Sequence, residues 1–162
     1  MAFELINFQS SQIKTMAVEE ILECNNTSSK FGLVLSREDV GELVEVRTES
    51  LKANGRVEFG GGVIETLIYE FCDSPYINKQ NYTETLNELI EIFYYYKNET
   101  FDMVPDDILI QYMKKAFNGS CCGSLKLLSE RELYKLTRKM CMNEDEDEEE
   151  ESEESSKEDD YE

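Results

Sequence analysis

The sequence contains no histidine among its 162 residues. Histidine is the side chain that most often serves as a general base near neutral pH, and it is a common zinc ligand. Its absence excludes the Cys-His and Ser-His pairs on which many nucleophilic enzymes depend. Any catalysis would have to use carboxylates, thiols, lysines or tyrosines.

Long apolar runs are also lacking, because no stretch approaches the roughly 20 residues that a membrane-spanning helix needs. The first residues carry Glu4 and no basic residue before Lys14, which does not fit a secretory signal. The five cysteines are an odd number and form no Cys-x-x-Cys pair, which favours reduced thiols over a disulfide framework. We therefore expect a soluble, cytoplasmic protein.

Basic side chains are scarce, with 16 lysines and arginines against 36 acidic residues. Residues 144–162 hold 14 of the acidic residues and a single basic one, Lys157, so we predict a disordered acidic tail there. Residues 1–143 have ordinary globular composition and are long enough for one domain with its own core.

This charge balance argues against two classes of partner. DNA and anionic membrane surfaces are bound by lysines and arginines that neutralise phosphate, so we expect neither nucleic acid nor a membrane as a partner. The candidate for a small local basic site is the group of Arg131, Lys135, Arg138 and Lys139.

Apolar residues recur at helical spacing along most of residues 1–143, which predicts a mainly α, single compact domain of five or six helices. Ser36, Asn81 and Pro105 mark helix starts, and Ser129 with Glu132 predicts the start of the last helix. Residues 31–35, a short apolar run, are either a strand or the extended entry to the next helix, and with residues 57–59 they predict a small two- or three-stranded β element.

The glycine-rich stretch that follows Gly55 is the first candidate site. Gly60, Gly61 and Gly62 enter a helix and, with Arg56, would present backbone N–H groups and a positive charge to an anion. No Gly-Lys-Ser/Thr motif accompanies them, so a flexible turn or close backbone packing is the alternative interpretation.

Arg47 stands in the apolar stripe of a predicted helix, where a guanidinium needs a carboxylate or carbonyl partner. Three interpretations are open for Arg47: its head reaches water while its stem lies along the core, it pairs inside the protein with Asp73, Glu58 or Glu99, or it binds a ligand. The ligand interpretation predicts a pocket that joins Arg47, Arg56, Glu58 and Asp73.

Two further kinds of chemistry are open. Cys121 and Cys122 lie in a glycine-flanked loop and are the candidates for a thiol-based redox or metal sensor, with partial burial as the simpler interpretation. Carboxylates suited to a hard cation such as Mg²⁺ are also frequent, although common acidic residues fall near one another by chance. They are Glu58, Glu65, Asp73, Glu99, Asp102, Asp106 and Asp107.

Three consecutive tyrosines, Tyr94, Tyr95 and Tyr96, precede Lys97 near the end of a predicted helix. Phe93 precedes them, and because each residue turns about 100° around a helix, these four consecutive aromatic side chains cannot all face one core. Tyrosine is enriched at protein interfaces, which makes this run a candidate interaction surface, with a role in the core or a second layer as the alternative.

Several of these segments resemble an uncharacterised bacterial family, known mainly from Firmicutes and described only as a domain of unknown function. The resemblance covers roughly residues 30–140 and is carried by residues 55–60, 71–77 and 93–99, by Gly119 and by residues 123–125. It implies no activity, cofactor or partner, and the acidic tail is not part of the shared pattern.

The sequence therefore favours a non-catalytic interaction or regulatory module with a protein partner and no cofactor. A small-ligand binder or enzyme with the Arg47 pocket and a thiol sensor at Cys121 and Cys122 are the alternatives.

Overall fold

The computed structural model describes residues 14–53, 55 and 60–139, and most of them are helical. Helical residues 14–23 are followed by the short helix α2 (Asn25–Ser28) and the 3-10 turn η1 (Ser29–Phe31). The longer helices are α3 (Arg37–Ala53), α4 (Gly62–Phe71), α5 (Tyr82–Glu99) and α6 (Asp106–Asn118). The last helical stretch consists of α7 (Leu125–Leu127), the π-helical turn η2 (Leu128–Glu132) and residues 133–139. The prediction of a mainly helical fold is confirmed.

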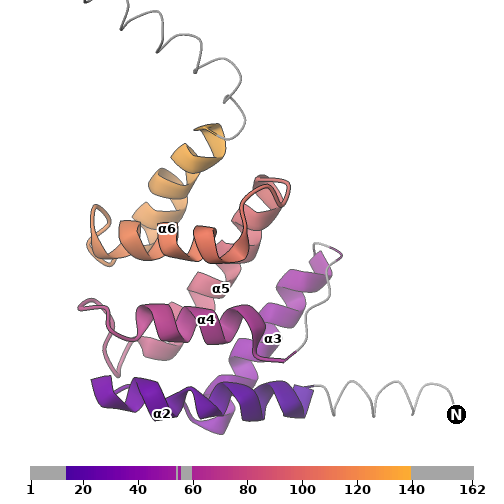
Figure 1. Cartoon of the computed structure of the whole chain (residues 1–162), viewed down its shortest axis with the longest axis vertical. Coiled ribbons are helices and arrows are strands. Elements are labelled where there is room, and N and C mark those ends of the chain that lie inside the picture. Colours follow the sequence, from indigo (N-terminus) through magenta and orange to yellow (C-terminus); the bar gives the residue numbers. More distant parts are fainter. Residues whose placement is uncertain (1–13, 54, 56–59, 140–162) are drawn as a thin grey trace, which may run out of the picture.

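The helices form stacked layers in Figure 1. The segment that carries α2, then α4, then α6 lie roughly parallel to one another, and α4 contacts both of its neighbours. Helix α5 runs across this stack and contacts α4 and α6, while α3 packs chiefly on α5. Helix α4 therefore lies at the centre of the described fold.

Helix α3 begins where the sequence predicts. The Ser36 hydroxyl accepts a hydrogen bond from the backbone N–H of Asp39 at 3.1 Å, and the Asp39 carboxylate accepts from the backbone N–H of Ser36 at 3.0 Å. This reciprocal pair satisfies backbone groups that have no partner inside the helix.

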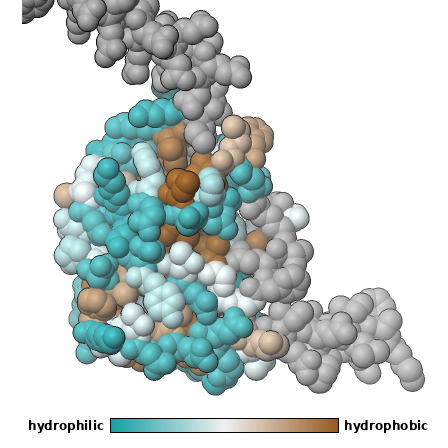
Figure 2. All heavy atoms as spheres, in the orientation of Figure 1, coloured by the Kyte–Doolittle hydropathy of each residue, from teal (hydrophilic) through white to brown (hydrophobic). Residues whose placement is uncertain are grey.

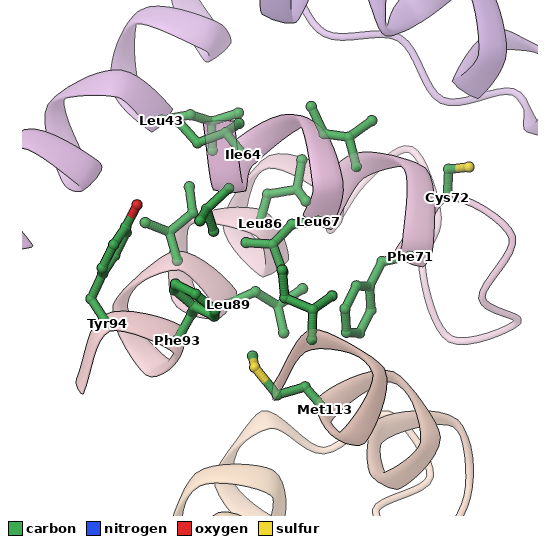
Figure 3. Packing of buried hydrophobic residues seen from close by; sticks show 14 of the residues in the cluster. Leu43, Ile64, Leu67, Phe71, Cys72, Leu86, Leu89, Phe93, Tyr94 and Met113 are labelled. Atoms are coloured by element: carbon green, nitrogen blue, oxygen red, sulfur yellow. The ribbon is translucent and has the colours of Figure 1, made fainter. Parts of the chain in front are cut away.

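The core lies where α4 meets α5 and α6. Figure 3 shows Leu67 and Phe71 of α4 in one cluster with Leu89 and Phe93 of α5 and Met113 of α6. All five side chains are buried. Burial of large apolar side chains is the main favourable term in folding, so this cluster sets the positions of the three helices.

Residues 33–36 are the extended entry to α3, which was the alternative to a strand, and Phe31 belongs to η1; no strand is assigned in the described residues. The side-chain amide of Asn25 forms the backbone hydrogen bonds that a neighbouring strand would otherwise form. Its Oδ1 accepts from the backbone N–H of Leu35 at 2.8 Å, and its Nδ2 donates to the Leu35 carbonyl at 2.9 Å. The other predicted strand, residues 57–59, and the predicted tail, residues 144–162, lie outside the described residues.

Candidate functional site

The glycine turn before α4 is held by two charged side chains from elsewhere in the chain. The Glu20 carboxylate accepts a hydrogen bond from the backbone N–H of Gly61 at 2.7 Å. Arg47 donates from Nη1 to the carbonyls of Gly60 at 2.6 Å and Gly61 at 3.2 Å. The position predicted for an external anion is therefore taken by a carboxylate of the protein itself.

Close approach explains why Gly60 is a glycine. Its backbone has a φ of 66°, a conformation that side-chain-bearing residues rarely adopt. A Cβ atom added there would lie 2.5 Å from Oε2 of Glu20, well inside contact distance. The backbone of Gly60 thus lies directly against the Glu20 carboxylate.

Arg47 is buried, with only 4% of its surface exposed. The interpretation in which its head reaches water is wrong, because the guanidinium lies against the glycine turn. Carbonyl oxygens accept its hydrogen bonds here, in line with the predicted need for a carboxylate or carbonyl partner. Arg47 thereby joins α3 to the start of α4.

Asp73 lies beyond the opposite end of α4 and is half exposed, 3.9 Å from Nζ of Lys114. The ten residues of α4 separate it from the glycine turn by about 15 Å of helix. The structure therefore does not bring Arg47 and Asp73 together. The other two predicted pocket residues, Arg56 and Glu58, lie outside the described residues.

The predicted metal-binding carboxylates are dispersed in the described part of the chain. Asp102 and Asp106 lie 3.7 and 2.7 Å from Nζ of Lys97, whose single positive charge balances only one of the two carboxylates. Within residues 14–53, 55 and 60–139, no three Cys, Asp or Glu side chains are grouped so that they could hold a metal ion. Glu65 is only partly buried, and its pKa is raised by that burial and by the nearby charge of Glu20.

The tyrosine run divides between core and surface. Tyr94 and Tyr96 are buried and Tyr95 is exposed, so the run does not form a continuous surface. Lys97 is buried too, and it donates to the Val104 carbonyl at 2.6 Å. The alternative interpretation, a place in the core or a second layer, describes three of these four side chains.

The loop between α5 and α6, unlike the tyrosine run, exposes several apolar side chains to solvent. Phe101 is 79% exposed, Met103 is 62% exposed, and Ile108 in the first turn of α6 is 57% exposed. We call these three residues the apolar cap. On the face drawn in Figure 2, apolar side chains reach the surface in the upper half of the molecule, where α6 and the following helix lie. The only feature of the sequence that could have indicated the apolar cap is a phenylalanine and a methionine outside the helical apolar stripe, just before Pro105.

The backbone of this loop has an unusual conformation. Phe101 and Asp102 both have positive φ angles, 52° and 59°. Two consecutive side-chain-bearing residues in this region cost on the order of 1 kcal/mol each. The backbone N–H of Asp102 donates to the Lys97 carbonyl at 3.0 Å, so both the backbone and the amine of Lys97 hold the loop.

The two adjacent cysteines differ in their surroundings. Cys121 is buried, and burial raises the pKa of its thiol, whereas Cys122 is exposed and donates from Sγ to the Gly119 carbonyl. Burial also raises the pKa of the Cys24 and Cys72 thiols. A raised pKa disfavours the reactive thiolate at the three buried positions. Of these four cysteines only Cys122 is exposed.

Together these features define a helical domain in which buried Arg47 and Lys97 hold loops in place, and in which Phe101, the most exposed large apolar side chain of the described residues, lies between α5 and α6. None of the described helices is long and apolar enough to cross a membrane. A family model described as a family of unknown function (DUF6323) matches residues 20–146, and the chain belongs to that family. The predicted family resemblance is confirmed, while the Firmicutes origin and the cytoplasmic location stay predictions. No curated protein and no solved structure matches the chain.

Proposed function

We propose that this protein is a non-catalytic interaction module that binds a partner protein through the apolar cap. The observation that carries the proposal is the exposure of Phe101 and Met103 on a loop whose backbone is held in a costly conformation. Strained backbone persists only where the surrounding structure enforces it, and such strain clusters at functional sites.

The anchoring of the loop explains how the cap stays exposed. Lys97 reaches the Val104 carbonyl and the Asp106 carboxylate, and so ties the end of α5 to the start of α6. With both ends of the loop fixed, Phe101 cannot fold back onto the core without breaking these contacts. Preorganised exposure of an aromatic side chain lowers the entropic cost of binding a partner.

The surroundings of the cap indicate the chemistry of the partner. Exposed Asp102, Asp106 and Asp107 lie on the same loop and first turn as the cap. Burial of apolar surface returns about 25 cal/mol per Å², so an apolar pocket on the partner would supply most of the affinity. Basic side chains around that pocket would complement the three aspartates. We therefore propose a partner with an apolar pocket rimmed by lysine or arginine.

The experiment compares two full-length variants in a capture assay with the host cell's proteins. In the first, Phe101→Ser and Met103→Ser remove the cap. In the second, Phe31→Ser and Val34→Ser remove two apolar side chains that are similarly exposed elsewhere. We expect a partner that is retained by the unmodified chain and by the control and lost by the cap variant.

Direct binding must then be measured with the purified partner. We expect the cap variant to raise the Kd by about tenfold or more, as for aromatic anchors at interfaces, with an unchanged melting temperature. Equal loss of binding in both variants, or the same Kd for the cap variant and the unmodified chain, would contradict the proposal.

A further inference from the structure

The last helix carries a basic outer face on an otherwise acidic protein. Lys135, Arg138 and Lys139 are exposed and share one face at helical spacing, and Arg131 lies one turn earlier. Leu133 on the opposite face is buried against the core. We call these four cationic residues the basic face.

The charge contrast with the rest of the surface is large. Residues 126–139 contain five basic and two acidic side chains, a net charge of +3. The other described residues contain nine basic and eighteen acidic side chains, a net charge of −9. Glu132 pairs with Arg131 at 2.9 Å and lies 3.9 Å from Nζ of Lys135, yet the helix keeps its net positive charge. The basic face is therefore a positive region that attracts an acidic ligand which the rest of the protein repels.

This face is held firmly on the domain. The hydroxyls of Tyr96 and Tyr112 donate to the carbonyls of Ser129 and Glu132 in the π-helical turn η2, the second at 3.2 Å. Arg131 adds a hydrogen bond to the Ser120 carbonyl at 3.1 Å. Hydrogen bonds to α5, to α6 and to the loop that follows α6 thus fix the orientation of the helix.

An acidic ligand for this face lies in the same chain. Residues 144–162 follow Lys139 after four intervening residues and carry 14 acidic side chains and one lysine. The basic face extends for only about 12 Å along the helix, whereas 19 residues can span up to about 60 Å. A segment tethered this closely has an effective concentration in the millimolar range.

We propose that residues 144–162 bind the basic face of the last helix within the same chain and shield it from other anionic ligands. Each exposed ion pair contributes little by itself, up to about 1 kcal/mol, so several pairs and the short tether act together. Such an interaction weakens with salt, because exposed charges are screened. The inference does not involve the apolar cap and stands independently of it.

The first test places a spin label on the acidic segment of the full-length chain. Ser155→Cys supplies the attachment point, and Cys122→Ser and Cys141→Ser remove competing sites. We expect the label to broaden the backbone NMR signals of residues 131–139 far more than those of the start of α5. The broadening should disappear at about 1 M salt, where the screening length is about 3 Å.

Charge reversal identifies the face that is bound. Lys135→Glu with Arg138→Glu should abolish the broadening. Lys30→Glu with Lys52→Glu makes the same change in net charge at two exposed lysines elsewhere and should leave the broadening intact. Broadening that survives the first variant, or that persists at high salt, would overturn the proposal.

A second test uses a labelled peptide with the sequence of residues 144–162. Its binding is measured to the unmodified chain and to a full-length variant in which the acidic residues of 144–151 are replaced by their amides. We expect the peptide to bind the amide variant about tenfold more tightly, because the face is then uncovered. Equal binding to both chains, or binding to neither, would show that the segment does not occupy the face.

Discussion

At the scale of single residues, Arg47 and Glu20 attach two segments that are far apart in the sequence to the glycine turn before α4. The guanidinium of Arg47 is buried and donates to the carbonyls of Gly60 and Gly61, while Glu20 accepts from the N–H of Gly61. A buried charge is tolerated only when hydrogen bonds and opposite charge compensate it. Arg47 and Glu20 therefore hold the glycine turn from two sides of the peptide chain, one by donating to its carbonyls and the other by accepting from its N–H.

Replacement of Arg47 by methionine, which keeps the apolar stem, should lower the free energy of unfolding by about 2–4 kcal/mol, because the two carbonyls lose a charged donor. Urea unfolding measures this loss. Arg37→Met is the matched control, since Arg37 pairs with Glu19 at 2.6 Å on the surface and should cost about 1 kcal/mol or less. Equal losses in the two variants would mean that the turn does not depend on the Arg47 head.

The sequence predicted that Arg47 needs a hydrogen-bond partner, but it did not predict which groups would serve as that partner. A charge in an apolar stripe shows that a partner is required, and the structure supplies carbonyls of a turn 13 and 14 residues away. The same limit applies to Tyr94, Tyr96 and Lys97. Helical spacing shows that the run must split between faces, whereas burial of three of the four side chains depends on how the neighbouring helices pack.

At the scale of elements, the last helix shows why local signals can misplace a boundary. Ser129 and Glu132 have the spacing of a capping box, yet the Ser124 hydroxyl caps the helix by accepting from the N–H of Leu127 at 3.2 Å. Ser129 and Glu132 instead belong to the π-helical turn. That turn depends on tyrosine hydroxyls from other helices, which no local pattern reveals.

Hydroxyl removal should weaken the attachment of this helix. Tyr96→Phe and Tyr112→Phe should each lower stability by about 0.5–1.5 kcal/mol, because a carbonyl of η2 loses its donor in each case. Tyr95→Phe, at an exposed neighbour, should have no measurable effect. Hydrogen exchange adds a local readout, with faster exchange expected in residues 128–139. Unchanged exchange there in both variants would mean that packing alone holds the helix.

The extended segment of residues 33–36 is a second case. Leu33 and Leu35 are buried and Val34 between them is exposed, which is the alternation typical of a strand. The hydrogen bonds go to Asn25 and Ser28 instead, with the Ser28 hydroxyl donating to the Leu33 carbonyl at 2.8 Å. A period-two pattern therefore predicts which side chains face the core, but it does not predict which groups form hydrogen bonds with the backbone.

At the scale of the whole molecule, stability at alkaline pH depends on buried tyrosine. Tyr82 is only 2% exposed, and burial raises its pKa to about 12 from an ordinary value near 10. Between these two values the unfolded chain loses the phenolic proton while the folded protein keeps it. The unfolded state then binds fewer protons, so stability must fall as the pH rises from about 10 to about 12.

Tyr82→Phe should remove this contribution. Below pH 10 both states of the unmodified protein keep the proton, so the variant should show no change in pH dependence there. Above pH 10, its free energy of unfolding should fall less steeply, by up to about 1.4 kcal/mol per pH unit. Urea unfolding at pH 9, 10 and 11 measures the slopes, with Tyr134→Phe as the control at an exposed tyrosine. Identical slopes for Tyr82→Phe and the unmodified protein would mean that the folded protein lets this hydroxyl ionise as freely as the unfolded chain does.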